Sequence, residues 1–162
     1  MARITTNFTN ALDEYLSTIS KISSRTEAVC KKAVYKGAQV VANQVREELY
    51  TVPTDERWGV TDKKKIGPTK AEKKDIIGGF GVSPIEKREG QINASVGFEG
   101  AMYNDDGKPI QMLARAVNSG TSFMHKNPFF EKAARKSRSK AKKIMIETAE
   151  AELQKIVKQE GK

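Results

Sequence analysis

The chain has 162 residues, a length typical of one domain with a substantial core. Hydrophobic residues make up 38% and charged residues 30%, and no apolar run approaches the roughly 20 residues that span a bilayer. A single cysteine, Cys30, excludes an internal disulfide framework, and the N-terminus lacks the apolar stretch of a signal peptide, so we expect the chain in the cytoplasm at synthesis.

Residues 7–50 are predicted to be helical almost throughout. Apolar residues recur there at three- and four-residue spacing, first from Phe8 to Ile22 and then from Val29 to Leu49. A break is expected near Ser23-Ser24, because serine competes for backbone hydrogen bonds. Gly37 costs about 1 kcal/mol relative to alanine inside a helix, so it either permits close approach of another backbone or is simply tolerated. Pro53 is expected to end the run.

Residues 51–75 are predicted to form a long exposed loop. Apolar residues are sparse, and charges of both signs alternate with glycine and proline. Loops of this length in a compact domain are usually functional or disordered. Trp58, the only tryptophan, is expected to anchor the loop in the core or to meet a partner.

Residues 76–118 are predicted to hold short strands and a connection. The segments 76–82, 85–88 and 91–98 are strand-like, and Glu89-Gly90 marks a hairpin turn between the last two. Apolar residues alternate with polar ones along 91–98, as in a half-buried strand. Asp105-Asp106-Gly107 is interpreted as a turn, because the later ligands of a calcium loop are missing.

Residues 113–130 organise the rest of the chain. A helix or strand end at 113–118 is followed by a turn at Ser119-Gly120-Thr121 and then by a helix start. Asn127 is the expected N-cap, and Pro128 suits the first helical position because its missing N–H costs nothing there. Of the adjacent Phe129 and Phe130, we expect one to enter the core and the other to meet a neighbouring element or subunit.

The last predicted element is a helix over 128–157, whose first half is strongly basic. Its inner stripe begins with small residues and ends with larger ones. A solvated helix face is the common explanation for such a charge block, and a nucleic-acid contact is the alternative. The candidate DNA-facing residues are Arg135, Lys136, Arg138, Lys140, Lys142 and Lys143.

The residues that carry enzyme chemistry are sparse. The chain has one histidine, His125, and one cysteine, so neither a metal cluster nor a nucleophilic triad is supported. His125 is interpreted as a capping or contact residue. We therefore expect no catalytic site, no metal and no cofactor.

The order of elements and one motif resemble a known family. The segments Ala116-Val117-Asn118-Ser119-Gly120-Thr121 and Asn127-Pro128-Phe129-Phe130 resemble the small tail-component family of long-tailed bacteriophages and prophages, the tail-completion or head–tail joining proteins. The acidic residue usual before Gly-Thr is replaced here by Asn118-Ser119. The motif covers 116–134, and the order of elements covers most of the chain.

The resemblance implies a structural virion protein that is made in the host cytoplasm. Such a protein would assemble as a homo-oligomeric ring, expected to be six-fold, between the head connector and the tail tube, with channel DNA as a possible non-specific contact. The implied assembly residues are Asn118, Gly120, Thr121, Pro128, Phe129, Phe130 and Trp58. The alternative hypothesis is a DNA-binding accessory module that uses the basic helix 132–143. A third hypothesis is a hydrolase that uses His125, for which no substrate is evident.

The expected fold is one α+β domain. A long N-terminal helix region and a long C-terminal helix would pack on a small, mainly antiparallel sheet.

Overall fold

The computed structural model describes residues 25–57, 63–98 and 102–160, and the predicted helical residues 7–24 and the predicted anchor Trp58 lie outside them. The α+β class with long helices towards both ends is confirmed. The elements are helices α2 (Arg25–Thr51), α3 (Lys70–Gly78), α4 (Ile110–Ser119) and α5 (Phe129–Glu160), and strands β1 (Phe80–Val82), β2 (Glu86–Arg88), β3 (Gln91–Asn93) and β4 (Val96–Phe98).

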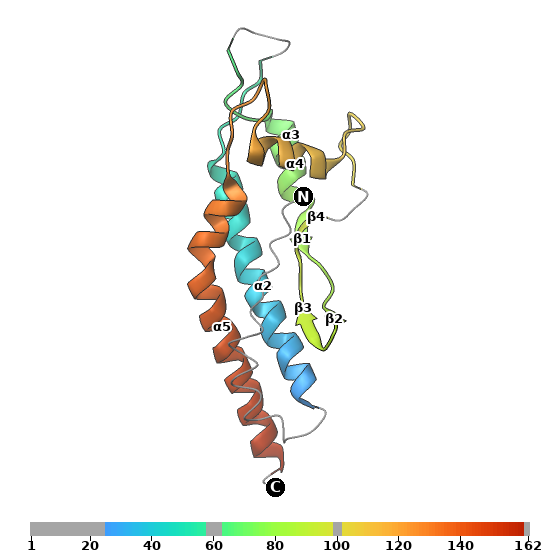
Figure 1. The fold of residues 1–162 in the computed structure, drawn as a ribbon, viewed down its shortest axis with the longest axis vertical. Helices are drawn as coiled ribbons and strands as arrows, with labels where there is room; N and C mark the ends of the chain where they lie inside the picture. The colour runs from blue at the N-terminus through green and yellow to red at the C-terminus, as the bar shows by residue number, and fades with distance from the viewer. Residues whose placement is uncertain (1–24, 58–62, 99–101, 161–162) are drawn as a thin grey trace.

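Helices α2 and α5 lie side by side and antiparallel, forming the long axis of the molecule (Figure 1). Buried residues recur at every fourth position along both helices, and many of them are small. Small side chains let the two helices approach closely. At Gly37 a Cβ atom would lie 2.5 Å from the Cγ of Met145, so the methionine occupies the space that the glycine leaves. The buried residues along this seam are Val29, Ala33, Gly37, Val41, Val45 and Leu49 of α2, and Ala133, Ser137, Ala141, Met145 and Ala149 of α5.

The strands form two separate two-stranded antiparallel sheets, β1–β4 and β2–β3, alongside α2. The predicted hairpin is confirmed: Arg88 pairs with Gln91, and both turn residues have positive φ, 50° at Glu89 and 80° at Gly90. The prediction of one continuous strand over 91–98 is wrong. The strand is interrupted at Ala94 and Ser95, where the N–H of Ser95 donates to the Oγ of Ser83, and the second half pairs with β1.

Helix α3 corrects the predicted loop over 51–75 and the predicted strand over 76–82. Thr69 and Glu72 form a capping box in which each side chain accepts the other's backbone N–H, at 3.1 Å and 3.0 Å. This cap begins a helix at Lys70 that buries Ile76, and the strand starts only at Phe80. Lys73 Nζ donates to the carbonyls of Tyr50 and Val52, at the end of α2, and thereby ties the two helices together.

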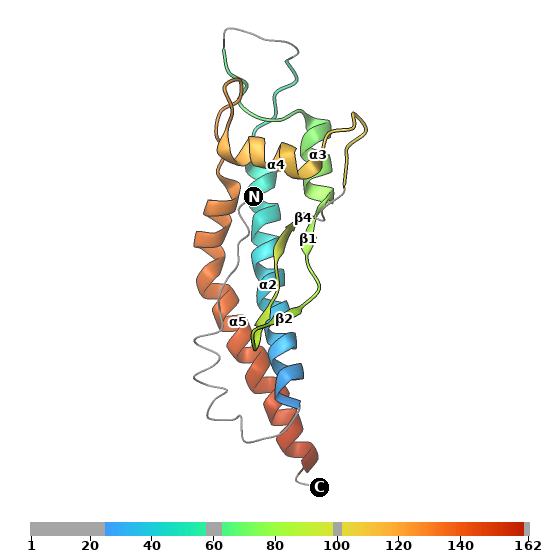
Figure 2. The same ribbon diagram turned by 45° about the vertical axis from the view of Figure 1, so that its right-hand side comes forward.

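Helices α3 and α4 lie across one end of the α2–α5 pair, and together with their loops they form a head (Figures 1 and 2). Helix α4 buries Ile110, Ala114 and Val117 at helical spacing. The segment 113–118 is therefore part of a helix and not a strand end.

An aromatic cluster fills the core where the head meets the helix pair. Phe130 lies 5.8 Å from Phe80 and 6.2 Å from Phe98, measured between ring centroids, and Phe129 lies 4.7 Å from Phe130. Both Phe129 and Phe130 are buried. The expectation that only one of them would enter the core is wrong, because the first turn of α5 is enclosed by β1 and β4 and by the end of α4.

Candidate functional site

The residues of the 113–130 motif meet at the junction between α4 and α5. Asn118, buried at the end of α4, accepts a 3.1 Å hydrogen bond from the backbone N–H of Phe130, and its Nδ2 donates to Glu131. The helix begins one residue later than predicted, at Phe129, and Pro128 takes the N-cap position instead of the first helical one, because its carbonyl accepts the first helical hydrogen bond, from the N–H of Lys132. Asn118 thus satisfies an amide of the first turn of α5.

The predicted capping role of Asn127 is wrong. Its Nδ2 donates to the carbonyls of Ile66, at 3.0 Å, and His125, at 3.1 Å. Its backbone N–H donates to Val117. Asn127 therefore links the loop that contains Ile66 to the junction, and Asn118 caps α5 instead.

The Gly120-Thr121 turn closes a compact loop between the two helices. Gly120 has φ of 76°, and a Cβ at this position would lie 3.0 Å from the backbone nitrogen of Lys126. Both the positive φ and the close approach favour glycine. The N–H of Thr121 donates to Met124, and its hydroxyl accepts from the N–H of Phe123.

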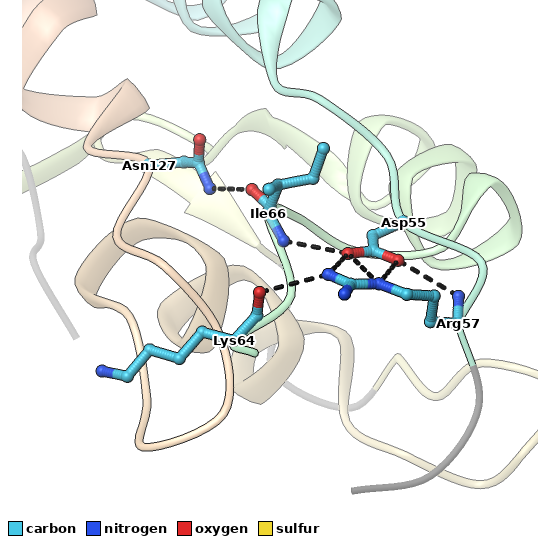
Figure 3. A network of polar contacts seen from close by, with 5 residues as sticks. All are labelled: Asp55, Arg57, Lys64, Ile66 and Asn127. Atoms are coloured by element: carbon cyan, nitrogen blue, oxygen red, sulfur yellow. Dashed lines mark hydrogen bonds and ion pairs between the residues drawn. The ribbon is translucent and has the colours of Figure 1, made fainter. Parts of the chain in front are cut away.

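A buried carboxylate braces the neighbouring loop (Figure 3). Asp55 accepts hydrogen bonds from the Nε and Nη2 of Arg57 at 2.9 Å and 2.6 Å, and from the backbone N–H groups of Arg57 and Ile66. The Arg57 guanidinium holds the pKa of this carboxyl far below its usual range, with help from the backbone N–H groups and against the effect of burial. Arg57 also donates to the carbonyl of Lys64, so one ion pair connects both ends of the loop.

The loop braced by Asp55 is in turn hydrogen-bonded to the turn between α4 and α5. Lys65 donates its N–H to Phe123 and accepts from the N–H of His125, each at 2.8 Å, forming a parallel bridge with Met124. We call residues 53–57 and 63–68 together with 121–127 the braced loop pair. Its described residues are anchored, in contrast to the exposed loop of low order expected from the sequence.

The braced loop pair exposes two large apolar side chains. Ile66 is 49% and Phe123 is 62% exposed, and the two residues lie on the two paired segments. Lys64 and Lys126, both exposed, flank them. Single exposed apolar residues are ordinary, but neighbouring ones on a rigid, basic loop are typical of a contact surface.

All six predicted DNA-facing residues are exposed on α5. At 100° per residue, Arg135 and Lys143 project away from the seam that α5 buries against α2, and Lys142 lies to one side of that seam. Lys136 differs from the others because its Nζ lies 2.6 Å from the carboxylate of Glu48, which is buried on α2. Its contact is thus structural, while the remaining members form a solvent-facing basic surface.

The residues that the sequence analysis missed are Asp55, Arg57, Lys73 and Glu48. Thr69 and Glu72 have the spacing of a capping box, and this pattern predicts the start of α3. For Asp55 and Arg57 no local pattern exists, since their partners lie up to eleven residues away.

Two surface hollows accompany this junction. One, of about 210 Å³, lies between Phe98, α4 and Phe130, and the other, of about 580 Å³, follows β1 and β4. Neither is lined by histidine or cysteine. His125 is exposed on the braced loop pair, and Cys30 is half-buried on α2.

Within the described ranges, no group of three or more His, Cys, Asp or Glu side chains is arranged to hold a metal ion. In the same part of the chain, no helix has the length and apolarity needed to cross a membrane. Comparisons with models of known families, with characterised proteins and with solved structures found no match.

Proposed function

We propose that this protein is a structural component of a phage particle that assembles at the head–tail interface, in tail completion or head–tail joining, and that it has no catalytic role. The observation that supports this most directly is how the motif residues are used. Asn118 caps α5, Gly120 permits the turn, and Phe129 and Phe130 fill the core. The motif thus builds a rigid junction, from which the braced loop pair projects.

The expected partners are further copies of the chain in a ring, with the connector or neck proteins and the tail tube on either side. An elongated helix pair with projecting, anchored loops offers separate contact surfaces for such neighbours (Figures 1 and 2). Exposed apolar side chains on the loop pair supply area that is buried on contact.

Electron microscopy of the purified protein, alone and mixed with phage connectors or tail tubes, tests this proposal. We expect rings, or density added to one end of the partner particle. An Ile66→Ser/Phe123→Ser variant should lose this incorporation. Val157→Ser is the matched control, because Val157 is also 62% exposed but lies near the other end of the helix pair, and it should incorporate normally. A protein that stays monomeric at every concentration and joins no partner particle would contradict the proposal.

A second candidate function, contact with DNA, is favoured by the charge distribution along α5. Seven Lys or Arg residues lie between 132 and 143, without an acidic residue among them. Each pair of like charges four residues apart, such as Arg138 and Lys142, destabilises a helix by about 0.2–0.5 kcal/mol. Lys132, in the first turn of α5, also opposes the helix dipole. A polyanion such as the DNA backbone would offset both costs.

The structure dictates which charges the DNA test should remove. Lys136 must be kept, because removing it would strand the buried Glu48. Replacing Arg135, Arg138, Lys140 and Lys142 by glutamine should abolish salt-sensitive retention on DNA, and binding by the native protein should weaken with salt in proportion to the phosphates contacted. A control variant loses the same charge elsewhere, at the exposed residues Lys36, Lys70, Lys74 and Lys158. Equal retention of both variants would exclude the α5 surface as the DNA contact.

A further inference from the structure

A second rigid turn projects from the head at the opposite end of α4 from the braced loop pair (Figures 1 and 2). We call residues 102–109 the acidic turn. Tyr103 and Pro109 form an antiparallel bridge. Asn104 closes the turn by accepting from the N–H of Lys108 at 2.7 Å and from the N–H of Gly107 at 2.9 Å. Gly107 has φ of 72°, which a glycine adopts without strain.

The acidic turn exposes an aromatic ring beside two carboxylates. Tyr103 is 63% exposed, and Asp105 and Asp106 are exposed at the tip. The cation within the turn, Lys108, lies 3.5 Å from Glu72 of α3, so its charge is shared with that carboxylate. The tip therefore presents negative charge next to apolar surface.

The braced loop pair presents the opposite sign. Phe123 and Ile66 are its exposed apolar side chains. Lys65, which is half-buried, precedes Ile66 and forms the bridge with Met124, and the exposed Lys126 lies three residues after Phe123. Like the acidic turn, it is held by backbone hydrogen bonds, so little conformational entropy remains to be lost on contact.

The two surfaces cannot meet within one chain. They flank α4, whose 10 residues span about 15 Å at 1.5 Å per residue, and they project from its opposite ends. Complementary surfaces at opposite ends of one rigid element can pair only between copies. Such a contact is heterologous, and it closes into a ring or extends into a filament.

We infer that the acidic turn of one copy docks on the braced loop pair of the next copy. Tyr103 packs against Phe123 and Ile66, while Asp105 and Asp106 face Lys65 and Lys126. This inference rests on the proposed assembly role and names one contact of that assembly. Because Asp105, Asp106 and Lys126 are exposed and Lys65 is only half-buried, salt screens these charges and the contact weakens as the salt concentration rises.

Complementary charge reversals test this contact. The variants are Asp105→Lys/Asp106→Lys and Lys65→Glu/Lys126→Glu, whose substitutions keep the backbone hydrogen bonds of both loops. Sedimentation velocity over a concentration series at low salt should show native self-association, and each variant alone should associate at least tenfold more weakly. An equimolar mixture should associate again, because each variant supplies the native surface that the other lacks.

The control Lys70→Glu/Lys74→Glu makes the same charge change on the exposed side of α3 and should associate like the native protein. Far-ultraviolet circular dichroism establishes that each variant is folded. Native-like association of both reversals would overturn the inference and leave the assembly role standing. Loss without recovery in the mixture would overturn the head-to-tail pairing. If the native protein stays monomeric on its own, the inferred contact between copies is also overturned. The proposed assembly role is then tested separately, by whether the protein joins partner particles.

Discussion

The side-chain oxygen of Asn118, at the end of α4, accepts a 3.1 Å hydrogen bond from the backbone N–H of Phe130, in the first turn of α5. The two residues are twelve positions apart, and both are buried. One side chain in the last turn of α4 therefore caps the first turn of α5 and links the two helices. This contact explains why the Gly120 turn and the two phenylalanines work as a unit.

We predict that Asn118→Ala lowers the free energy of unfolding by about 1–2 kcal/mol, because it removes a cap and leaves the buried N–H of Phe130 without its acceptor. Asn127→Ala is the matched comparison, and its loss should be smaller because the Nδ2 of Asn127 joins exposed carbonyls. Urea denaturation followed by circular dichroism measures both. A larger loss for Asn127→Ala would restore the cap assignment made from sequence.

Features encoded by neighbouring residues were predicted well. The hairpin follows from Glu89-Gly90, since a tight turn needs residues that tolerate positive φ. The start of α5 follows from Pro128 and the phenylalanines after it. Thr69 and Glu72 belong to the same class and were overlooked because the charged segment around them suggested a loop.

Features that depend on distant partners could not be predicted in this way. The alternation over 91–98 is real, but the interruption at Ser95 involves a hydrogen bond to Ser83, twelve residues earlier, and β4 pairs with the equally distant β1. Likewise, the hydrogen-bond network of Asp55 includes the backbone N–H of Ile66, eleven residues later in the chain. Local periodicity shows which residues are half-buried, and it does not show what covers them.

Gly37→Ala should destabilise the protein, although alanine is the better helix former by about 1 kcal/mol. The added methyl would lie 2.5 Å from the Cγ of Met145, and overpacking typically costs about 1–3 kcal/mol. Thermal unfolding measures the change. Gly78→Ala in α3 is the control, since a Cβ there meets nothing within 4 Å, and it should be neutral or stabilising.

The Gly37 effect should depend on Met145 alone. In a Met145→Ala background, Gly37→Ala should cost less than in the native protein, and the difference is the coupling energy of the pair. A cost that is unchanged by Met145→Ala would contradict this explanation, because the next nearest atom, the carbonyl oxygen of Ala141 at 3.6 Å, would be in ordinary van der Waals contact with the added methyl.

Asp55 should make the loop pair sensitive to acid. Its pKa is lowered in the folded state, mainly by Arg57, so its stabilisation is fully present above the unfolded pKa of about 3.9 and is lost as the pH falls from there through the lower folded pKa. The difference in unfolding free energy between the native protein and Asp55→Asn should therefore be largest near pH 7 and shrink below about pH 5.

Hydrogen exchange locates the effect of Asp55. The amide of Ile66 donates to the Asp55 carboxylate and should exchange faster in Asp55→Asn. The amide of Lys73, which donates to Thr69 in α3, serves as the internal control and should be unchanged. Equal acceleration at both amides would indicate a global loss of stability instead of release of the loop.

The Lys136–Glu48 pair predicts an asymmetric response to mutation. Glu48 is buried, and its carboxylate lies 2.6 Å from Lys136 Nζ, with Gln44 Nε2 at 3.4 Å. Lys136→Met leaves this carboxylate without its cationic partner. Because the lysine side chain is 61% exposed, we expect the free energy of unfolding to fall by only about 1 kcal/mol.

Adding Glu48→Gln should recover most of this loss, since a neutral amide is less costly to bury than an unpaired carboxylate. Lys140→Met, at another exposed α5 position, should change stability by less than about 0.5 kcal/mol in urea denaturation. If Lys140→Met cost as much as Lys136→Met, the loss would reflect a general property of the basic surface, and the pair with Glu48 would not anchor α5 to α2.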